Sequence, residues 1–177
     1  MAFLVLTVVG PDRPGLVSTL SATVAGRGGS WLDSEMAQLA GQFAGILLVS
    51  VPDADVAALA ADLRALEGGE LHLTVQPAAR DEGPAARRAL QLDLVCQDRP
   101  GIVRDLTRAL AEQGVNIEEL ATAVRSAAFS GEQVFEASAV LRVPEAMAVD
   151  ALRAVLDRLG DDLMADISVE EAPVSGG

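Results

Sequence analysis

Two short segments of the chain have residue types that could bind a small charged molecule. Residues 12–15 and 98–101 both read Asp-Arg-Pro-Gly, and apolar residues at helical spacing follow each segment. The first N–H groups of a helix lack intrahelical partners, and the helix dipole favours a carboxylate there. An aspartate beside these groups can accept hydrogen bonds from an ammonium group. Each segment therefore has the groups that a zwitterion requires.

The proline and glycine of each segment indicate where the helices and their free donors begin. Proline has no N–H and is tolerated at the first helical position. We therefore expect helices over residues 14–27 and 100–113. The donors would begin at Gly15 and Gly101, where the missing side chain lets a ligand approach the main chain.

Both segments belong to a longer internal repeat. They lie 86 positions apart, and the same offset aligns the apolar residues on either side of them. Val51-Pro52 matches Val143-Pro144 at an offset of 92, so the second copy has an insertion, which we place in a hairpin loop at residues 126–131. The chain holds two copies of one unit.

Hydrophobic periodicity predicts the same order of elements in both copies. In the first copy we expect a strand at 3–9, a helix at 14–27, strands at 31–39 and 42–51, a helix at 54–67 and a strand at 71–76. In the second we expect a strand at 90–96, a helix at 100–113, strands at 115–125 and 133–143, a helix from 149 that ends at Gly160, and a strand at 163–169.

This order predicts an α+β fold with two ferredoxin-like βαββαβ domains. With right-handed crossovers, each forms a four-stranded antiparallel sheet with two helices on one face. We expect domains at 1–77 and 89–171, a linker at 78–88 that is rich in proline and charge, and a flexible tail at 172–177.

Composition excludes several classes of function. The chain has 177 residues, with 13 basic residues, all arginine, against 26 acidic ones, for a net charge of −13. Such an acidic surface repels phosphate backbones, so we expect no direct nucleic-acid binding. With one histidine, one cysteine, no lysine and no tyrosine, we expect no catalytic residues, metal site or cofactor. The single cysteine and the lack of a long apolar stretch predict a cytoplasmic protein without a membrane span.

The first strand, the Asp-Arg-Pro-Gly loop, the apolar helix and the Gly-Val-Asn-Ile that follows at 114–117 resemble the ACT domain, a small-molecule regulatory module. The first copy resembles it too, but has Gly29-Ser30-Trp31 where the asparagine would stand. Two such units over nearly the whole chain look like the glycine cleavage system transcriptional repressor family, whose members are tandem ACT proteins without a DNA-binding domain. The pattern also resembles the ACT portion of formyltetrahydrofolate deformylase.

The resemblance implies a regulatory protein that binds a small amino acid such as glycine between two ACT units. It also implies a protein partner, with a transcription factor as the candidate. One unit would supply its loop and the other a polar residue from the start of its second strand. The implied ligand-binding residues are Asp98, Arg99, Gly101, Ile102 and Asn116 in the second copy, and Asp12, Gly15, Leu16 and Ser30 in the first. The free strand edges favour a homodimer.

Simpler interpretations of the same residues stay open. Asp12 and Asp98 could cap their helices without any ligand, and Asn116 could satisfy backbone groups of a turn. Cys96 is most simply a small buried hydrophobe, and His72 alternates onto the outer face of a strand. The whole chain could be a ligand-free oligomerisation or adaptor module, or the accessory unit of a deformylase-like enzyme.

Overall fold

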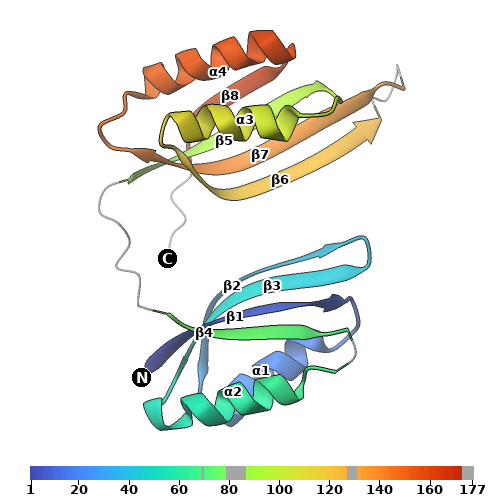
Figure 1. The fold of residues 1–177 in the computed structure, drawn as a ribbon, viewed down its shortest axis with the longest axis vertical. Helices are drawn as coiled ribbons and strands as arrows, with labels where there is room; N and C mark the ends of the chain where they lie inside the picture. Colours follow the sequence, from blue (N-terminus) through green and yellow to red (C-terminus); the bar gives the residue numbers. More distant parts are fainter. Residues whose placement is uncertain (69, 79–86, 127–130, 173–177) are drawn as a thin grey trace. The chain divides into compact units, whose positions relative to one another are not determined.

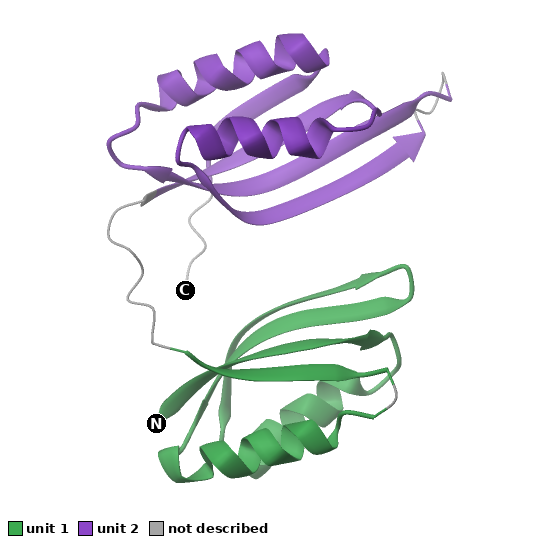
Figure 2. Cartoon of the chain, viewed as in Figure 1, with its two compact units in different colours: residues 1–83 green, residues 84–177 purple. Residues whose placement is uncertain are grey.

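The chain forms two compact units, residues 1–83 and 84–177, which we call domain 1 and domain 2 (Figure 2). The structure is a computed structural model that describes residues 1–68, 70–78, 87–126 and 131–172. Both domains have the element order that the periodicity predicts, so the predicted α+β fold with two ferredoxin-like units is confirmed.

Domain 1 is a four-stranded antiparallel sheet with the strand order β2-β3-β1-β4. Its two helices cover one face of that sheet (Figure 1). The elements are β1 (Ala2–Pro11), α1 (Leu16–Gly26), β2 (Ser30–Leu39), β3 (Gln42–Val51), a short 3₁₀ turn (Asp53–Asp55), α2 (Val56–Ala65) and β4 (His72–Ala78).

Domain 2 repeats the arrangement with the strand order β6-β7-β5-β8. Its helices also share one face of the sheet (Figure 1). The elements are β5 (Arg87–Gln97), α3 (Ile102–Glu112), β6 (Asn116–Ser126), β7 (Gln133–Pro144), α4 (Val149–Leu163) and β8 (Asp166–Glu171).

The core of each domain lies between its sheet and its helices. Alternate residues of the central strand are fully buried, as Leu6 is in β1 and Leu92 is in β5. They pack with apolar residues one helical turn apart, such as Leu20 of α1 and Leu106 of α3. Burying these side chains stabilises each domain and fixes the register in which the central strand presents the loop that follows it.

The edge strands β2 and β6 carry the same irregularity. The register with the neighbouring strand shifts between Trp31 and Asp33 in β2, and between Ile117 and Glu119 in β6. A bulge of this kind adds one residue and strengthens the local twist. The repeat therefore extends to a detail of backbone geometry that alternation alone does not predict.

The prediction that the last helix ends at Gly160 is wrong. Helix α4 continues to Leu163, and the chain leaves it at Met164, which has φ of 50°. A Cβ atom at Gly160 would lie only 3.0 Å from the carbonyl oxygen of Ala165. The glycine is therefore a packing requirement inside the helix, and Leu163 is a buried helical residue instead of the first residue of a strand.

The boundary between the two units falls between Gly83 and Pro84, inside the segment expected to be a linker. Strand β4 already includes Ala78, and β5 begins at Arg87. Residues 79–86 lie outside the described residues, as do 127–130 of the expected hairpin loop and 173–177 of the expected tail.

Candidate ligand-binding site

The two Asp-Arg-Pro-Gly loops occupy the same place in their domains, directly after the central strand. The amide of Asp12 donates a hydrogen bond to the carbonyl of Gly41 at 2.9 Å, and the amide of Asp98 donates to the carbonyl of Gln133 at 2.8 Å. These bonds hold the start of each loop against the neighbouring hairpin. The aspartate side chains are exposed and form no ion pair among the described residues.

Glycine, not proline, stands at the start of each helix. Gly15 and Gly101 are the N-cap residues, with φ of 91° and 98°, and the helices begin at Leu16 and Ile102. The predicted first helical position for Pro14 and Pro100 is therefore wrong, because the chain turns through a left-handed residue after them. Only glycine adopts this conformation without strain. Among the described residues no side-chain hydrogen bond caps either helix, so the alternative in which Asp12 and Asp98 are caps is wrong as well.

The first amides of both helices have no hydrogen-bond acceptor in the described part of the chain. The first intrahelical bond of α1 runs from the amide of Thr19 to the carbonyl of Gly15 at 2.8 Å, so the amides of residues 16–18 precede it. In α3 the corresponding bond runs from Asp105 to Gly101 at 3.0 Å. Free amides at the positive end of a helix dipole are suited to an anion.

The surroundings of the two glycines differ. Nothing lies within 4 Å of the position that a Cβ atom of Gly15 would take. At Gly101 a guanidinium nitrogen of Arg104 lies 3.0 Å from that position. Arg104 in turn binds the carboxylate of Asp105 at 3.0 Å, and this hydrogen bond lowers the pKa of Asp105. An ion pair therefore lies beside the second loop, whereas the first is open.

Neither Arg104 nor Asp105 is among the residues that the sequence predicts for the site. The available signal was an acidic residue in the first turn of a helix, where it interacts favourably with the helix dipole. Thr19 stands at the corresponding place in α1, so this charge is absent from domain 1.

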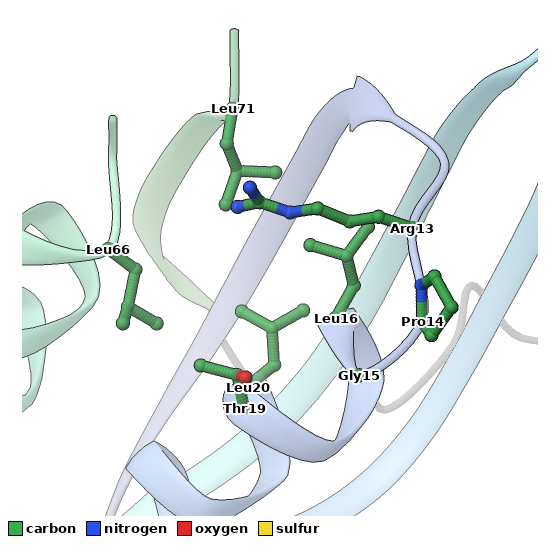
Figure 3. A pocket seen from close by; sticks show the side chains of 8 residues that line it. All are labelled: Arg13, Pro14, Gly15, Leu16, Thr19, Leu20, Leu66 and Leu71. Atoms are coloured by element: carbon green, nitrogen blue, oxygen red, sulfur yellow. The ribbon is translucent and has the colours of Figure 1, made fainter. Parts of the chain in front are cut away.

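A cavity of about 160 Å³ opens beside the loop of domain 1. Figure 3 shows the side chains around it, which come from the loop, from α1, from the end of α2 and from the start of β4. Its lining residues are Arg13, Pro14, Gly15, Leu16, Thr19, Leu20, Leu66 and Leu71. Its lining combines the apolar side chains of four leucines with polar groups, among them Arg13 and Thr19, which are exposed.

The predicted residues Ser30 and Asn116 lie far from the loop of their own domain. Ser30 pairs with Ser50, which pairs with Phe3 at the opposite end of β1 from Pro11. Eight residue steps separate these ends, or about 27 Å at roughly 3.4 Å per residue. Asn116 is likewise aligned, through β7, with Ala89 near the start of β5. No single domain brings the loop and the polar residue of the second strand together.

The only cysteine and the only histidine lie where their alternation predicts. Cys96 is buried in the core of domain 2, and burial raises the pKa of its thiol. His72 is exposed and pairs with Val9, on the face of the sheet away from the helices. The described residues contain no group of three or more His, Cys, Asp or Glu side chains arranged to hold a metal ion.

Within the described ranges, no helix is long and apolar enough to cross a membrane.

Comparisons with known proteins identify the family. Models of the ACT domain match residues 2–76 and 91–157. The glycine cleavage system transcriptional repressors of Escherichia coli and Shigella flexneri are each 30% identical over 129 residues, an alignment that covers 71% of this chain and 66% of theirs. The crystal structure of an unknown protein from Galdieria sulphuraria has a TM-score of 0.87 at 29% identity and covers 97% of this chain and 99% of its own. The chain therefore belongs to the ACT-domain family, as a tandem of two ACT domains related in sequence to the glycine cleavage system transcriptional repressor.

Proposed function

We propose that the protein is a regulatory protein, not an enzyme, that binds a small amino acid at its Asp-Arg-Pro-Gly loops and signals occupancy to a protein partner. The observation that carries this proposal is the set of free amides after Gly15 and Gly101, at the positive ends of two helices. The carboxylate of the ligand would accept hydrogen bonds from these amides. The exposed carboxylates of Asp12 and Asp98, which form no ion pair in the described part of the chain, are suited to accept hydrogen bonds from its ammonium group.

The second half of the site would come from another ACT unit. Strands β2 and β6 are edge strands, each paired on one side among the described residues. If two such edges pair antiparallel, the start of one strand lies beside the end of the other. The end of each strand lies at the same end of the sheet as the Asp-Arg-Pro-Gly loop, because Pro11 and Leu39 both pair with Gln42.

This pairing would bring Ser30 or Asn116 of one unit to the loop of its neighbour. The long separation within one domain thus supports a ligand held between units, either within a chain or in a homodimer. A ligand that bridges two units would stabilise their pairing by about 2.7 kcal/mol at a concentration a hundred times its Kd. The paired and unpaired forms would present different surfaces to a partner, and this difference is the proposed signal.

The related repressor suggests the kind of partner. With a net charge of −13 the chain is poorly suited to bind DNA directly, so we propose that it acts on a transcription factor in the cytoplasm. Genes of glycine cleavage are the proposed target, because the relatives are described as repressors of that system.

A ligand-free adaptor is the second candidate, and one observation favours it in domain 2. The Arg104–Asp105 ion pair occupies the space beside Gly101, with a guanidinium nitrogen of Arg104 only 3.0 Å from the position of a Cβ atom, so it obstructs the place that a ligand would take. In domain 1 the corresponding space is open. Binding to domain 1 alone would assign the sensing role to that domain and a pairing role to domain 2.

Thermal shift and calorimetry on the full chain against the twenty amino acids test the proposal. We expect at least one amino acid to raise the melting temperature and to bind with measurable heat. If none does either, the protein is not an amino-acid sensor and the adaptor role is favoured.

A further inference from the structure

We propose that the loop of domain 1 binds an amino acid with a branched aliphatic side chain, such as leucine, in preference to glycine. The aliphatic group would enter the cavity beside the loop, and the ligand carboxylate, bound by the free amides of α1, would also pair with Arg13. This inference rests on the proposed function, because it assumes an amino acid at the loop, and it adds the chemical class of that ligand.

The cavity has the size and surface of an aliphatic subsite. Its volume is about 160 Å³, and Leu16, Leu20, Leu66 and Leu71 contribute apolar side chains to it. An enclosed cavity of about 150 Å³ lined by apolar side chains alone binds benzene, so a space of this size can hold an aliphatic group. An isobutyl group is smaller than benzene and would fit, whereas glycine would leave the space empty.

The mouth of the cavity holds an unpaired cation. In Figure 3 the guanidinium of Arg13 reaches across the cavity toward Leu71. No described residue accepts a hydrogen bond from it. A guanidinium can bind a carboxylate with two parallel hydrogen bonds. Arg13 is therefore suited to hold the carboxylate while the side chain of the ligand points inward.

The other polar groups near the mouth suit the rest of an amino acid. Thr19 lines the cavity and is exposed, whereas Asp12 does not line it but stands one residue before Arg13, with an exposed carboxylate that has no ion pair among the described residues. A ligand ammonium between them would be solvated on one side and paired on the other. The arrangement places charge outside and hydrocarbon inside, which matches leucine, isoleucine or valine.

Domain 2 differs at the residues that would form such a subsite. At Gly10 of domain 1 a Cβ atom would lie 2.9 Å from a methyl carbon of Leu71, so the absence of a side chain lets that leucine approach the sheet. The repeat places Cys96 at the corresponding position, with its side chain buried in the core. Helix α4 also continues to the buried Leu163, whereas α2 ends at Ala65.

Calorimetry with leucine and with glycine on the full chain tests the inference. Each buried methylene contributes about 0.8 kcal/mol, so we expect leucine to bind at least about tenfold more tightly than glycine. Arg13→Gln should remove a carboxylate partner and weaken the binding of both amino acids, and Thr19→Phe should obstruct the mouth and abolish the preference. Ala25→Phe on the exposed surface of α1 and Arg64→Gln on α2 are the matched controls, and both should retain it.

The possible results separate this inference from the proposed function. If glycine binds as tightly as leucine, the aliphatic subsite is wrong while amino-acid sensing stands. If leucine is preferred but Thr19→Phe leaves the preference intact, the cavity is not the subsite, and if Arg13→Gln leaves the affinity for leucine intact, Arg13 does not bind the carboxylate. If no amino acid binds, both proposals fail. Trp31 fluorescence in urea shows whether each variant of domain 1 is folded, since Trp31 is the only tryptophan.

Discussion

The guanidinium of Arg99 donates a hydrogen bond to the backbone carbonyl of Asp162 at 3.1 Å. This bond ties the loop of domain 2 to the last turn of α4, where carbonyl groups lack helical partners. Arg13 has the same place in the repeated motif but no acceptor among the described residues. Arg99 thus holds the loop of domain 2 against α4, whereas Arg13 of domain 1 remains available to a ligand.

This difference predicts that the same substitution changes the stability of one domain and not of the other. Arg99→Gln should lower the free energy of unfolding of domain 2 by about 0.5–1 kcal/mol, the net value of one exposed hydrogen bond. Arg13→Gln should leave domain 1 unchanged. Hydrogen exchange followed by mass spectrometry in urea resolves the two domains. Equal effects of the two substitutions would show that the Arg99 bond does not stabilise domain 2.

The left-handed glycines predict a second stability effect. Gly15→Ala should destabilise domain 1 by about 1–2 kcal/mol, because alanine is strained at φ of 91°. Gly26→Ala in the same helix is the control. Its Cβ would meet nothing within 4 Å and its φ is not positive, so it should be neutral or stabilise by up to about 1 kcal/mol. Urea unfolding followed by Trp31 fluorescence measures both, and a neutral Gly15→Ala would contradict the loop geometry.

The sequence was sufficient to predict the fold because hydrophobic periodicity and the internal repeat indicate the same elements. Alternation in β1 and β5 and helical spacing in α1 and α3 predict the elements, and the copies support each other at the same offset. The loops could be located for the same reason, since a motif that recurs after a central strand must lie at the same end of each sheet. The burial of Cys96 also follows from alternation alone.

What the sequence did not predict depends on contacts between elements. From the sequence, Gly160 is expected to end the helix. In the structure it lies within α4, where the missing side chain lets the carbonyl oxygen of Ala165 lie close to the helix. Pro14 reads as the first residue of a helix, but the left-handed Gly15 moves the start of α1 to Leu16. The cavity beside Arg13 is invisible to periodicity, because its walls come from two segments, residues 13–20 and 66–71, that are distant in the sequence.

An ion pair between the two helices of domain 1 predicts a pH effect. Arg27 binds Asp62 at 2.6 Å, and this hydrogen bond lowers the pKa of Asp62 below its ordinary value of 3.8. The folded state therefore holds the proton of Asp62 less tightly than the unfolded state does. The contribution of this ion pair to the free energy of unfolding is complete well above pH 3.8. It is lost as the pH falls through the lowered pKa of Asp62 in the folded state.

The Asp62→Asn protein should therefore lose less of the free energy of unfolding of domain 1 in acid than the unsubstituted protein does. The difference should be small, because both side chains are partly exposed. Urea unfolding by Trp31 fluorescence between about pH 6 and pH 3 measures it. Glu35→Gln is the control, since Glu35 has no ion pair among the described residues. An identical pH profile for Asp62→Asn and the unsubstituted protein would contradict the role of the ion pair.

The position of Asn116 predicts a change in ligand affinity without a change in stability. It is exposed at the start of the edge strand β6, so Asn116→Ala should leave the unfolding of domain 2 unchanged. If its amide binds a charged group of a ligand on a neighbouring unit, the affinity should fall about tenfold or more. Thr122→Ala, in the middle of the same strand, should have no effect. Equal affinity of both variants would exclude the shared site for domain 2.

Isothermal titration calorimetry of the full chain with individual amino acids tests most directly whether the Asp-Arg-Pro-Gly loops bind a zwitterion. We predict saturable binding of at least one amino acid, with weaker binding when Asp12 and Asp98 are both replaced by alanine. Absence of binding for all twenty, or binding that the double substitution leaves unchanged, would contradict the account.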